Sequence, residues 1–278
     1  MADEPASVND ILAGQPAPES LLAELYDLEH DEIHSDLGFY REWAHRAGGA
    51  VIDLGCGSGR LFASLLAGGA ARIVGIDGSA ALVHRAEERI EADATLREAR
   101  AAGRIELVID DVRQARRDDT FALGIMAGVI AHLDGPADAL RALRAAGALL
   151  EPDGRLIVDG LGPGAMPAHD LPLSVDWERT EGGRRIVRRS LLTRHEVPEG
   201  LRVTYDTLTD VRDPDGTIAR LPASFRLWYP SPTALVALAT EADLVVDTTF
   251  GSHDLDSLDE ESERCIIVLG VRDGRRTD

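Results

Sequence analysis

The stretch that decides the fold is AVIDLGCGSGR, residues 50–60. Its apolar first half, residues 50–54, predicts a short buried strand. Glycines at alternate positions follow, and they permit a sharp turn in which the backbone approaches a ligand closely. The next stretch, 61–66, has the apolar spacing of a helix. Strand, glycine turn and helix in this order form a ligand-binding unit of open α/β sheets.

The spacing of the glycines narrows the choice of ligand. A dinucleotide-binding loop carries glycine at the first, third and sixth positions. Here Arg60 takes the sixth position, Gly59 comes one residue early, and Asp53 stands two places before the first glycine. This pattern counts against a nicotinamide-dependent oxidoreductase, which stays an alternative function.

Acidic residues directly follow the next two predicted strands. Residues 72–76 predict a second strand that ends at Asp77, and residues 105–109 predict a third that ends at Asp110 and Asp111. Open α/β folds place an acid after the second strand, where it binds the ribose hydroxyls of a nucleotide. An ionised carboxylate can accept hydrogen bonds from both hydroxyls. Asp77 is therefore a predicted ribose ligand.

The rest of the chain continues the alternation of strands and helices that is typical of a parallel sheet. A helical pattern opens at Pro136 and precedes a turn and a fifth strand within 149–158. The other predicted elements are a fourth strand at 121–126, a last helix at 231–242 and closing strands at 244–250 and 264–271.

The D-x-G-x-G-x-G stretch and the later segments, taken in order, resemble the class I S-adenosylmethionine-dependent methyltransferases. The resemblance implies an α/β fold with a Rossmann-like, doubly wound, seven-stranded sheet, to which this chain adds an antiparallel β insertion. It implies S-adenosyl-L-methionine as the cofactor, with the acid after the third strand facing the adenine amino group. The cofactor-binding residues on this basis are Asp53, Gly55, Cys56, Gly57, Gly59, Asp77, Gly78, Asp111, Val112 and Ala127.

The same resemblance suggests two catalytic candidates, each with a plainer alternative. In many small-molecule methyltransferases a tyrosine of the N-terminal segment faces the sulfonium, and Tyr26 matches it; the alternative is a core tyrosine with its hydroxyl at the surface. His132 follows the fourth strand, and its ionisation range suits proton transfer near neutral pH. Its alternatives are packing or contact with the donor.

The chain divides into three predicted parts. Residues 1–48 form a polar tail and a helical cap, and residues 49–162 with 230–273 form the S-adenosylmethionine-binding α/β domain. Residues 163–229 contain strand-like runs separated by turns, and they predict an antiparallel insertion of about four strands that covers the acceptor site. This arrangement resembles glycine and amino-sugar N-methyltransferases and favours a small-molecule acceptor.

Composition excludes several other classes. The net charge is −20 and every basic residue apart from histidine is arginine, so a phosphate backbone would be repelled and nucleic acid is a poor partner. No apolar run is long enough for a membrane span, and no Cys/His cluster has metal-ligand spacing. The N-terminus lacks the pattern of a signal peptide, and the chain has only two cysteines. Both observations favour the cytoplasm. A homodimer is possible.

These observations predict an enzyme that transfers a methyl group to nitrogen or oxygen of a small molecule. Two alternatives remain: the oxidoreductase named above, and a non-catalytic module that binds S-adenosylmethionine.

Overall fold

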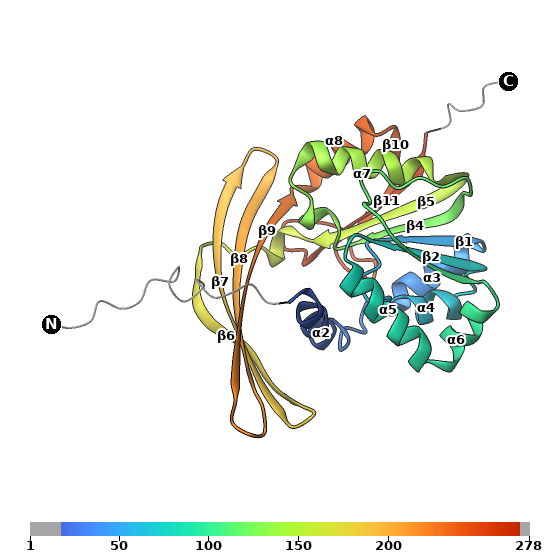
Figure 1. Ribbon diagram of the computed structural model, residues 1–278. Coiled ribbons are helices and arrows are strands. Elements are labelled where there is room, and N and C mark those ends of the chain that lie inside the picture. Colours follow the sequence, from blue (N-terminus) through green and yellow to red (C-terminus); the bar gives the residue numbers. More distant parts are fainter. Residues whose placement is uncertain (1–17, 273–278) are drawn as a thin grey trace.

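A seven-stranded sheet forms the centre of the computed structural model, which describes residues 18–272 (Figure 1). Strand β1 (Ala50–Leu54) lies between β4 and β2 and is parallel to both, because its apolar run can be buried on both faces. The strand order is β10-β11-β5-β4-β1-β2-β3, and β11 runs in the opposite direction to the other six strands. The other bounds are β2 Arg72–Asp77, β3 Ile105–Ile109, β4 Phe121–Ala127, β5 Leu150–Leu161, β10 Leu244–Phe250 and β11 Arg264–Val271.

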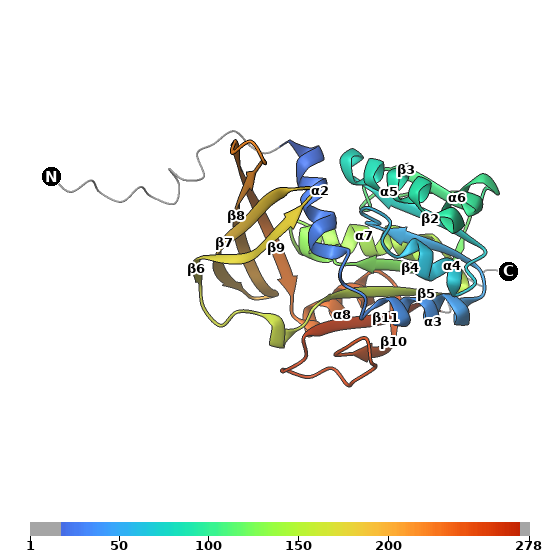
Figure 2. The same ribbon diagram turned by 90° about the horizontal axis from the view of Figure 1, so that it is seen from below.

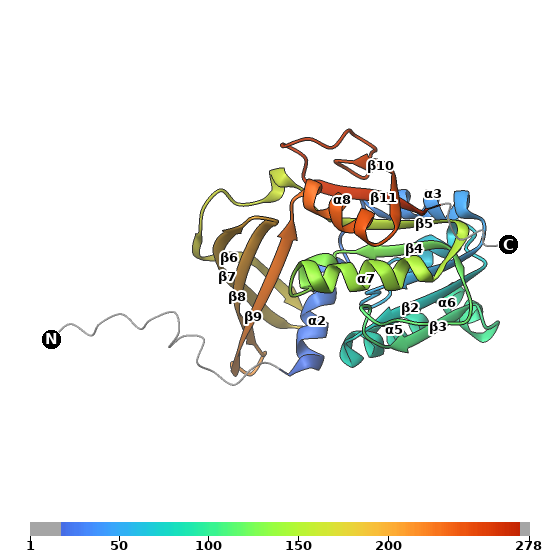
Figure 3. The ribbon, with the colours of Figure 1, turned by 90° about the horizontal axis from the view of Figure 1, so that it is seen from above.

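Helices cover both faces of this sheet (Figures 1 and 3). One core cluster joins α3, α4 and α6 to one face, and the other joins α7 and α8 to the opposite face. Local sequence sets where they begin: the Ser79 hydroxyl caps α5 by accepting from the Leu82 amide at 3.3 Å, and Pro136 opens α7. The bounds are α3 Leu37–Ala47, α4 Phe62–Ala67, α5 Ala80–Ala92, α6 Ala94–Ala101, α7 Pro136–Ala148 and α8 Pro232–Glu241.

The predicted insertion is a separate four-stranded antiparallel sheet, which we call the meander. Its strands follow chain order and are joined by the turns that glycine and proline predicted, with Gly182 and Gly183 both at positive φ. Its first strand starts at Leu171. The Arg202 guanidinium ties it to the α/β unit by donating to the Asp134 carbonyl at 2.9 Å. The bounds are β6 Leu171–Glu181, β7 Arg184–Val197, β8 Gly200–Arg212 and β9 Ile218–Pro230.

Helix α2 (Glu19–His30) lies between the meander and the α/β unit (Figure 2). On one side Leu25 packs against Ile186, Val211 and Leu221 of the meander. On the other side its buried Asp27 accepts from Arg85 at 2.7 Å. The α2 helix thus holds the two sheets together.

The helical cap predicted within residues 1–48 contains helices α2 and α3, with a break between them. Arg60, from the end of the glycine turn, donates to the Ile33 carbonyl at 2.9 Å and to Asp36 Oδ1 at 2.8 Å. These long-range bonds hold residues 31–36 out of helical geometry, which local periodicity could not reveal. The predicted polar tail over 1–17 and the last predicted domain residue, 273, lie outside the described residues.

The described residues contain no disulfide between the two cysteines, no membrane-spanning helix and no metal-binding cluster. Cys56 and Cys265 are both free and pack in different core clusters. In the described part of the chain, no helix is long and apolar enough to cross a bilayer, and no group of His, Cys, Asp and Glu side chains could hold a metal ion.

The position of α2 can be tested through Asp27. Asp27→Ala leaves Arg85 and Arg89 without their shared buried partner, so the free energy of unfolding should fall by about 1–2 kcal/mol, less than for a fully buried pair because both arginines are partly exposed. The control is Asp31→Ala, which removes an exposed partner of Arg89 and should cost less than about 0.5 kcal/mol. Equal losses in urea denaturation would contradict the clamping role of Asp27.

Candidate active site

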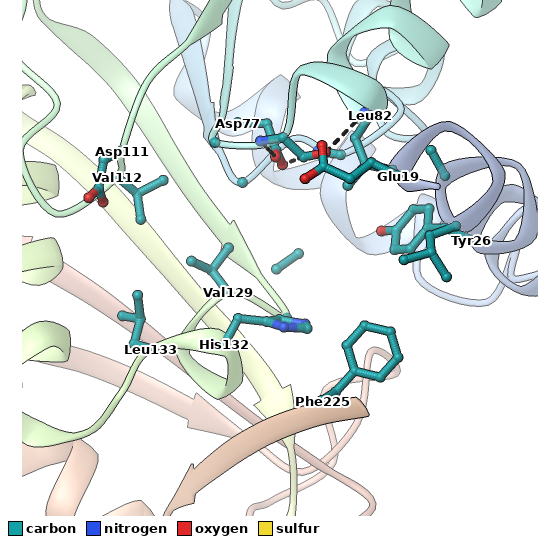
Figure 4. Close-up of a pocket in the computed structure, with 18 of the residues that line it drawn as sticks. Glu19, Tyr26, Asp77, Leu82, Asp111, Val112, Val129, His132, Leu133 and Phe225 are labelled. Atoms are coloured by element: carbon teal, nitrogen blue, oxygen red, sulfur yellow. Dashed lines mark hydrogen bonds between the residues drawn. The ribbon is translucent and has the colours of Figure 1, made fainter. Parts of the chain in front are cut away.

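A cavity of about 900 Å³ opens at the carboxyl ends of β1–β4 (Figure 4). Its walls come from three parts of the chain: the strand ends and loops of the α/β unit, helix α2, and the inner face of the meander. This volume is in the range that accommodates a nucleotide-sized ligand with a small acceptor. The α/β unit contributes Gly55, Gly57, Asp77, Asp111 and His132, α2 contributes Glu19, Tyr26 and Glu29, and the meander contributes Arg188, Thr207, Thr209 and Phe225.

The glycine turn forms one wall of the cavity. Gly55 and Gly57 have φ of +82° and +54°, which favour glycine. A Cβ on Gly55 would lie 2.3 Å from Val129 Cγ2, so the turn also needs the missing side chain. The Gly57 amide donates to Asp77 Oδ2 at 2.9 Å, while Asp77 Oδ1 accepts from the Ser79 amide at 2.8 Å. Asp77 therefore fixes the turn and the start of α5 together.

Asp53 lies beneath this turn and is almost completely buried, at 2% exposure. Its carboxylate has no hydrogen-bond partner within residues 18–272. Burial, and then the nearby charge of Asp77, raise its pKa to about 7, although Arg60 acts in the opposite direction. A cationic group placed beside it would relieve this cost.

Tyr26 faces the glycine turn from α2. Its hydroxyl would lie 3.2 Å from a Cβ on Gly57, and its ring stacks on His30 with centroids 3.9 Å apart. Burial raises the pKa of Tyr26 to about 12. The phenol therefore stays protonated at neutral pH and presents a hydrogen-bond donor to the cavity (Figure 4).

His132 ends the 3₁₀ turn η1 (Ile130–His132) that follows β4. Its imidazole extends into the cavity on the side of Phe225 (Figure 4). The side chain is exposed within this open space, yet the surrounding protein is close enough that desolvation lowers its pKa below the usual value. His132 is therefore neutral at pH 7 and has a nitrogen that can accept a proton.

Asp111, the predicted adenine ligand, is held by Arg113. Both of its oxygens accept from Arg113 Nε at 2.9 Å, and Oδ2 also accepts from Nη2 at 2.6 Å. Arg113 in turn donates to Asp138 at 2.6 Å. These bonds lower the pKa of Asp111 and keep the carboxylate ionised at the cavity wall.

Most of the predicted site residues meet at this cavity. Cys56 and Gly59 do not line it: Cys56 is buried beside Gly75, and a Cβ on Gly59 would lie 3.0 Å from the Phe62 ring, so both serve packing of the turn. Asp53 lies behind the lining. The residues that do line it are Tyr26, Gly55, Gly57, Asp77, Gly78, Asp111, Val112, Ala127 and His132.

Apart from Tyr26, the residues that the meander and α2 bring to the cavity were not predicted from the sequence. The alternation along β8 places Thr207 and Thr209 on one face, and this signal could have identified them. No pattern in the sequence indicated that Arg188 and Glu29 would line the cavity. Trp228, near the end of β9, is buried in the core of the α/β unit at 1% exposure and does not line the cavity.

Comparison with known proteins agrees with this geometry. Residues 51–154 match a family model described as a methyltransferase domain. The chain carries a methyltransferase domain of the class I, S-adenosylmethionine-dependent type. The matched residues contain the glycine turn, Asp77, Asp111 and His132. S-adenosylmethionine is accordingly the cofactor, and the fold predicted from the sequence is confirmed.

Solved structures share the methyltransferase fold at low identity. An S-adenosylmethionine-dependent methyltransferase from Clostridium acetobutylicum is 15% identical, with a TM-score of 0.72 over 91% of this chain and 98% of that one. The sugar N-methyltransferase KedS8 from Streptoalloteichus is 20% identical, with a TM-score of 0.69 over 98% and 99%. The amino pentose methyltransferase CalS10 from Micromonospora echinaspora is 18% identical, with a TM-score of 0.65 over 92% and 98%. No curated protein matches the sequence.

The buried carboxyl of Asp53 makes a pH-dependent contribution to stability. Because its pKa is raised from 3.8 to about 7, the protein loses stability as pH rises through this window. Asp53→Asn removes the titrating carboxyl, so the variant should not lose stability in this way. The unfolding free energy of the variant minus that of the wild type should therefore rise by about 2–3 kcal/mol from pH 5 to pH 8. Urea denaturation at both pH values, without cofactor, measures this. A difference that does not change with pH would show that Asp53 is ionised throughout.

Proposed function

We propose that this methyltransferase transfers a methyl group from S-adenosylmethionine to a nitrogen atom of a small-molecule acceptor. The observation that carries the proposal is His132: among residues 18–272 it is the one histidine that lines the cavity, and its lowered pKa keeps it neutral. A neutral imidazole at this place can take the proton that a methylated amine must release.

The strength of this base favours nitrogen over oxygen. An amine has a pKa of about 8–10, a few units above that of an imidazole, and each unit of this difference adds about 1.4 kcal/mol to the transfer of its proton to His132. An aliphatic hydroxyl is a far weaker acid than an ammonium group, so the same transfer would cost much more, whereas a phenolic hydroxyl has a pKa of about 10, close to that of an amine. His132 is therefore better suited to an amine than to an aliphatic hydroxyl.

The residues of the α/β unit suit the donor. Asp77 has oxygens near the glycine turn for ribose hydroxyls, and the ionised Asp111 can accept from the adenine amino group. The orphaned Asp53 carboxyl lies behind Gly55 and Gly57, where a positively charged donor would offset its burial. We expect these residues to hold S-adenosylmethionine.

The remaining lining residues suit a small cationic acceptor. Glu19, Glu29 and Asp134 bring negative charge to the cavity, and Arg188 offsets part of it by pairing with Glu29. This balance attracts an ammonium group. The titles of structural neighbours point the same way, since KedS8 is a sugar N-methyltransferase and MtfA is a glycopeptide N-methyltransferase.

Bound S-adenosylmethionine supplies a methyl group on a positively charged sulfur, so the amine lone pair forms the new C–N bond while the electron pair of the C–S bond returns to sulfur. His132 accepts the proton that leaves the nitrogen. Tyr26 closes the site from α2 and excludes water beside Gly57. Holding the reactants in line can contribute about 7–11 kcal/mol, and this positioning is the main task of the protein.

We infer that nucleic acid is not the acceptor, because a net charge of −20 would repel it. The cytoplasmic location and the homodimer stay predictions from the sequence. The alternative of a non-catalytic module that binds S-adenosylmethionine would be favoured if the protein binds the donor but methylates no amine.

His132→Asn should lower kcat for methylation of an amine by about 10²-fold or more, because the proton acceptor is removed. Binding of S-adenosylhomocysteine, measured by calorimetry, should not change. His195→Asn is the matched control, since His195 lies on the meander away from the cavity. An unchanged kcat in His132→Asn would remove His132 from the mechanism.

A further inference from the structure

The inner face of the meander presents a polar wall to the cavity. We call Arg188, Thr207, Thr209 and Phe225 the meander wall; all four line the cavity. The strand register places Arg188 opposite Thr209, and alternation along β8 puts Thr207 on the same face. The polar members are deeply buried, with exposures of 8% for Arg188, 4% for Thr207 and 2% for Thr209.

The two threonines of the wall are buried at the cavity, and the Thr207 hydroxyl is poorly satisfied within the protein. The Thr207 hydroxyl has one contact, to the Ala223 carbonyl, at the long distance of 3.5 Å. Thr209 lies two residues further along β8, is 2% exposed and lines the same cavity. Buried hydroxyls normally have a partner, because leaving them unpaired is costly. Both hydroxyls are therefore available to a ligand in the cavity.

Arg188 adds donors to this wall without adding net charge. It pairs with Glu29 of α2, which also accepts from the Trp177 indole at 3.0 Å, and its guanidinium lies over the Tyr205 ring. The Arg188 Nε atom is buried, lies 3.7 Å from Asp176 Oδ2 and has no hydrogen-bond partner among the described residues. The pair thus offers donors and acceptors side by side.

These properties select one kind of chemical group. An anion would meet the carboxylate of Glu29 and the negative charges of Glu19 and Asp134. A hydrocarbon would leave two hydroxyls without a partner when it displaced water from them. A hydroxyl group both donates and accepts, as do the threonines and the Arg188–Glu29 pair.

We propose that the meander wall recognises hydroxyl groups, so that the acceptor is a polyhydroxylated amine whose hydroxyls bind Thr207, Thr209 and Arg188. This inference rests on the proposed transfer to nitrogen and adds the part of the acceptor that does not react. Phe225, on the side of His132, provides the apolar surface for the carbon skeleton (Figure 4). A site that pairs with substrate hydroxyls strongly rejects analogues that lack them.

The test compares three amines of similar ring size as methyl acceptors: cyclohexylamine, trans-2-aminocyclohexanol and glucosamine. Each is incubated with the protein and S-adenosylmethionine, and kcat/KM is measured by mass spectrometry of the methylated amine. The proteins are the wild type, the double variant Thr207→Val/Thr209→Val, and the control Thr204→Val. Thr204 lies on the same strand but on the opposite face, and it does not line the cavity.

The wild type should prefer the amines in the order of their hydroxyl content. In the double variant the preference for glucosamine over cyclohexylamine should fall by about tenfold or more, since two hydrogen bonds are lost. Thr204→Val should keep the wild-type preference. Comparing the ratio of kcat/KM values between the variant and the wild type cancels the intrinsic differences in basicity between the amines, because both proteins receive the same amines. The single variants replace the double variant if its melting temperature shows that it is not folded.

The outcomes separate this inference from the proposed function. Methylation of cyclohexylamine as efficiently as glucosamine by the wild type, or an unchanged preference in the double variant, would overturn recognition by the wall and leave transfer to nitrogen intact. Methylation of none of the three amines, with donor binding intact, would count against the proposed function and the inference with it.

Discussion

The placement of α2 by buried ion pairs is the constraint on which the cavity depends. Asp27 turns toward Arg85 and Arg89 of α5, and Glu29, two residues further along and therefore on the other side of the helix, reaches Arg188 of the meander. Removing one partner from a buried pair is costly, so these contacts fix the rotation of the helix as well as its position. That rotation points Tyr26 at the glycine turn. One short helix therefore gives both sheets a common wall.

The arrangement of charges separates the two ends of the cavity. Carboxylates at the strand ends, such as Asp77 and Asp111, are held by backbone amides or by Arg113, and they stay in place as acceptors. At the other end the Arg188–Glu29 pair cancels its own charge, and neutral His132 lies between. The end that we propose for the nucleotide is thus defined by fixed acceptors, whereas at the far end the Arg188–Glu29 pair offers both donors and acceptors.

The sequence was sufficient for the α/β unit because its signals are local. The strand of residues 50–54, the glycine turn and the acids after the strands each depend on neighbours in the chain. The meander side of the cavity depends on contacts across long separations, as when Glu29 meets Arg188. The break between α2 and α3 has the same origin, since Arg60 acts on residues more than twenty positions away. Periodicity contains no information about such pairs.

The central claim is that one cavity between α2, the strand ends and the meander holds donor and acceptor together. A crystal structure with S-adenosylhomocysteine tests it most directly. The ribose should lie at Asp77, the adenine at Asp111, and the sulfur should face the space between Tyr26, His132 and Phe225. A ligand bound elsewhere, or a sulfur that faces away from His132 and the meander, would contradict the claim.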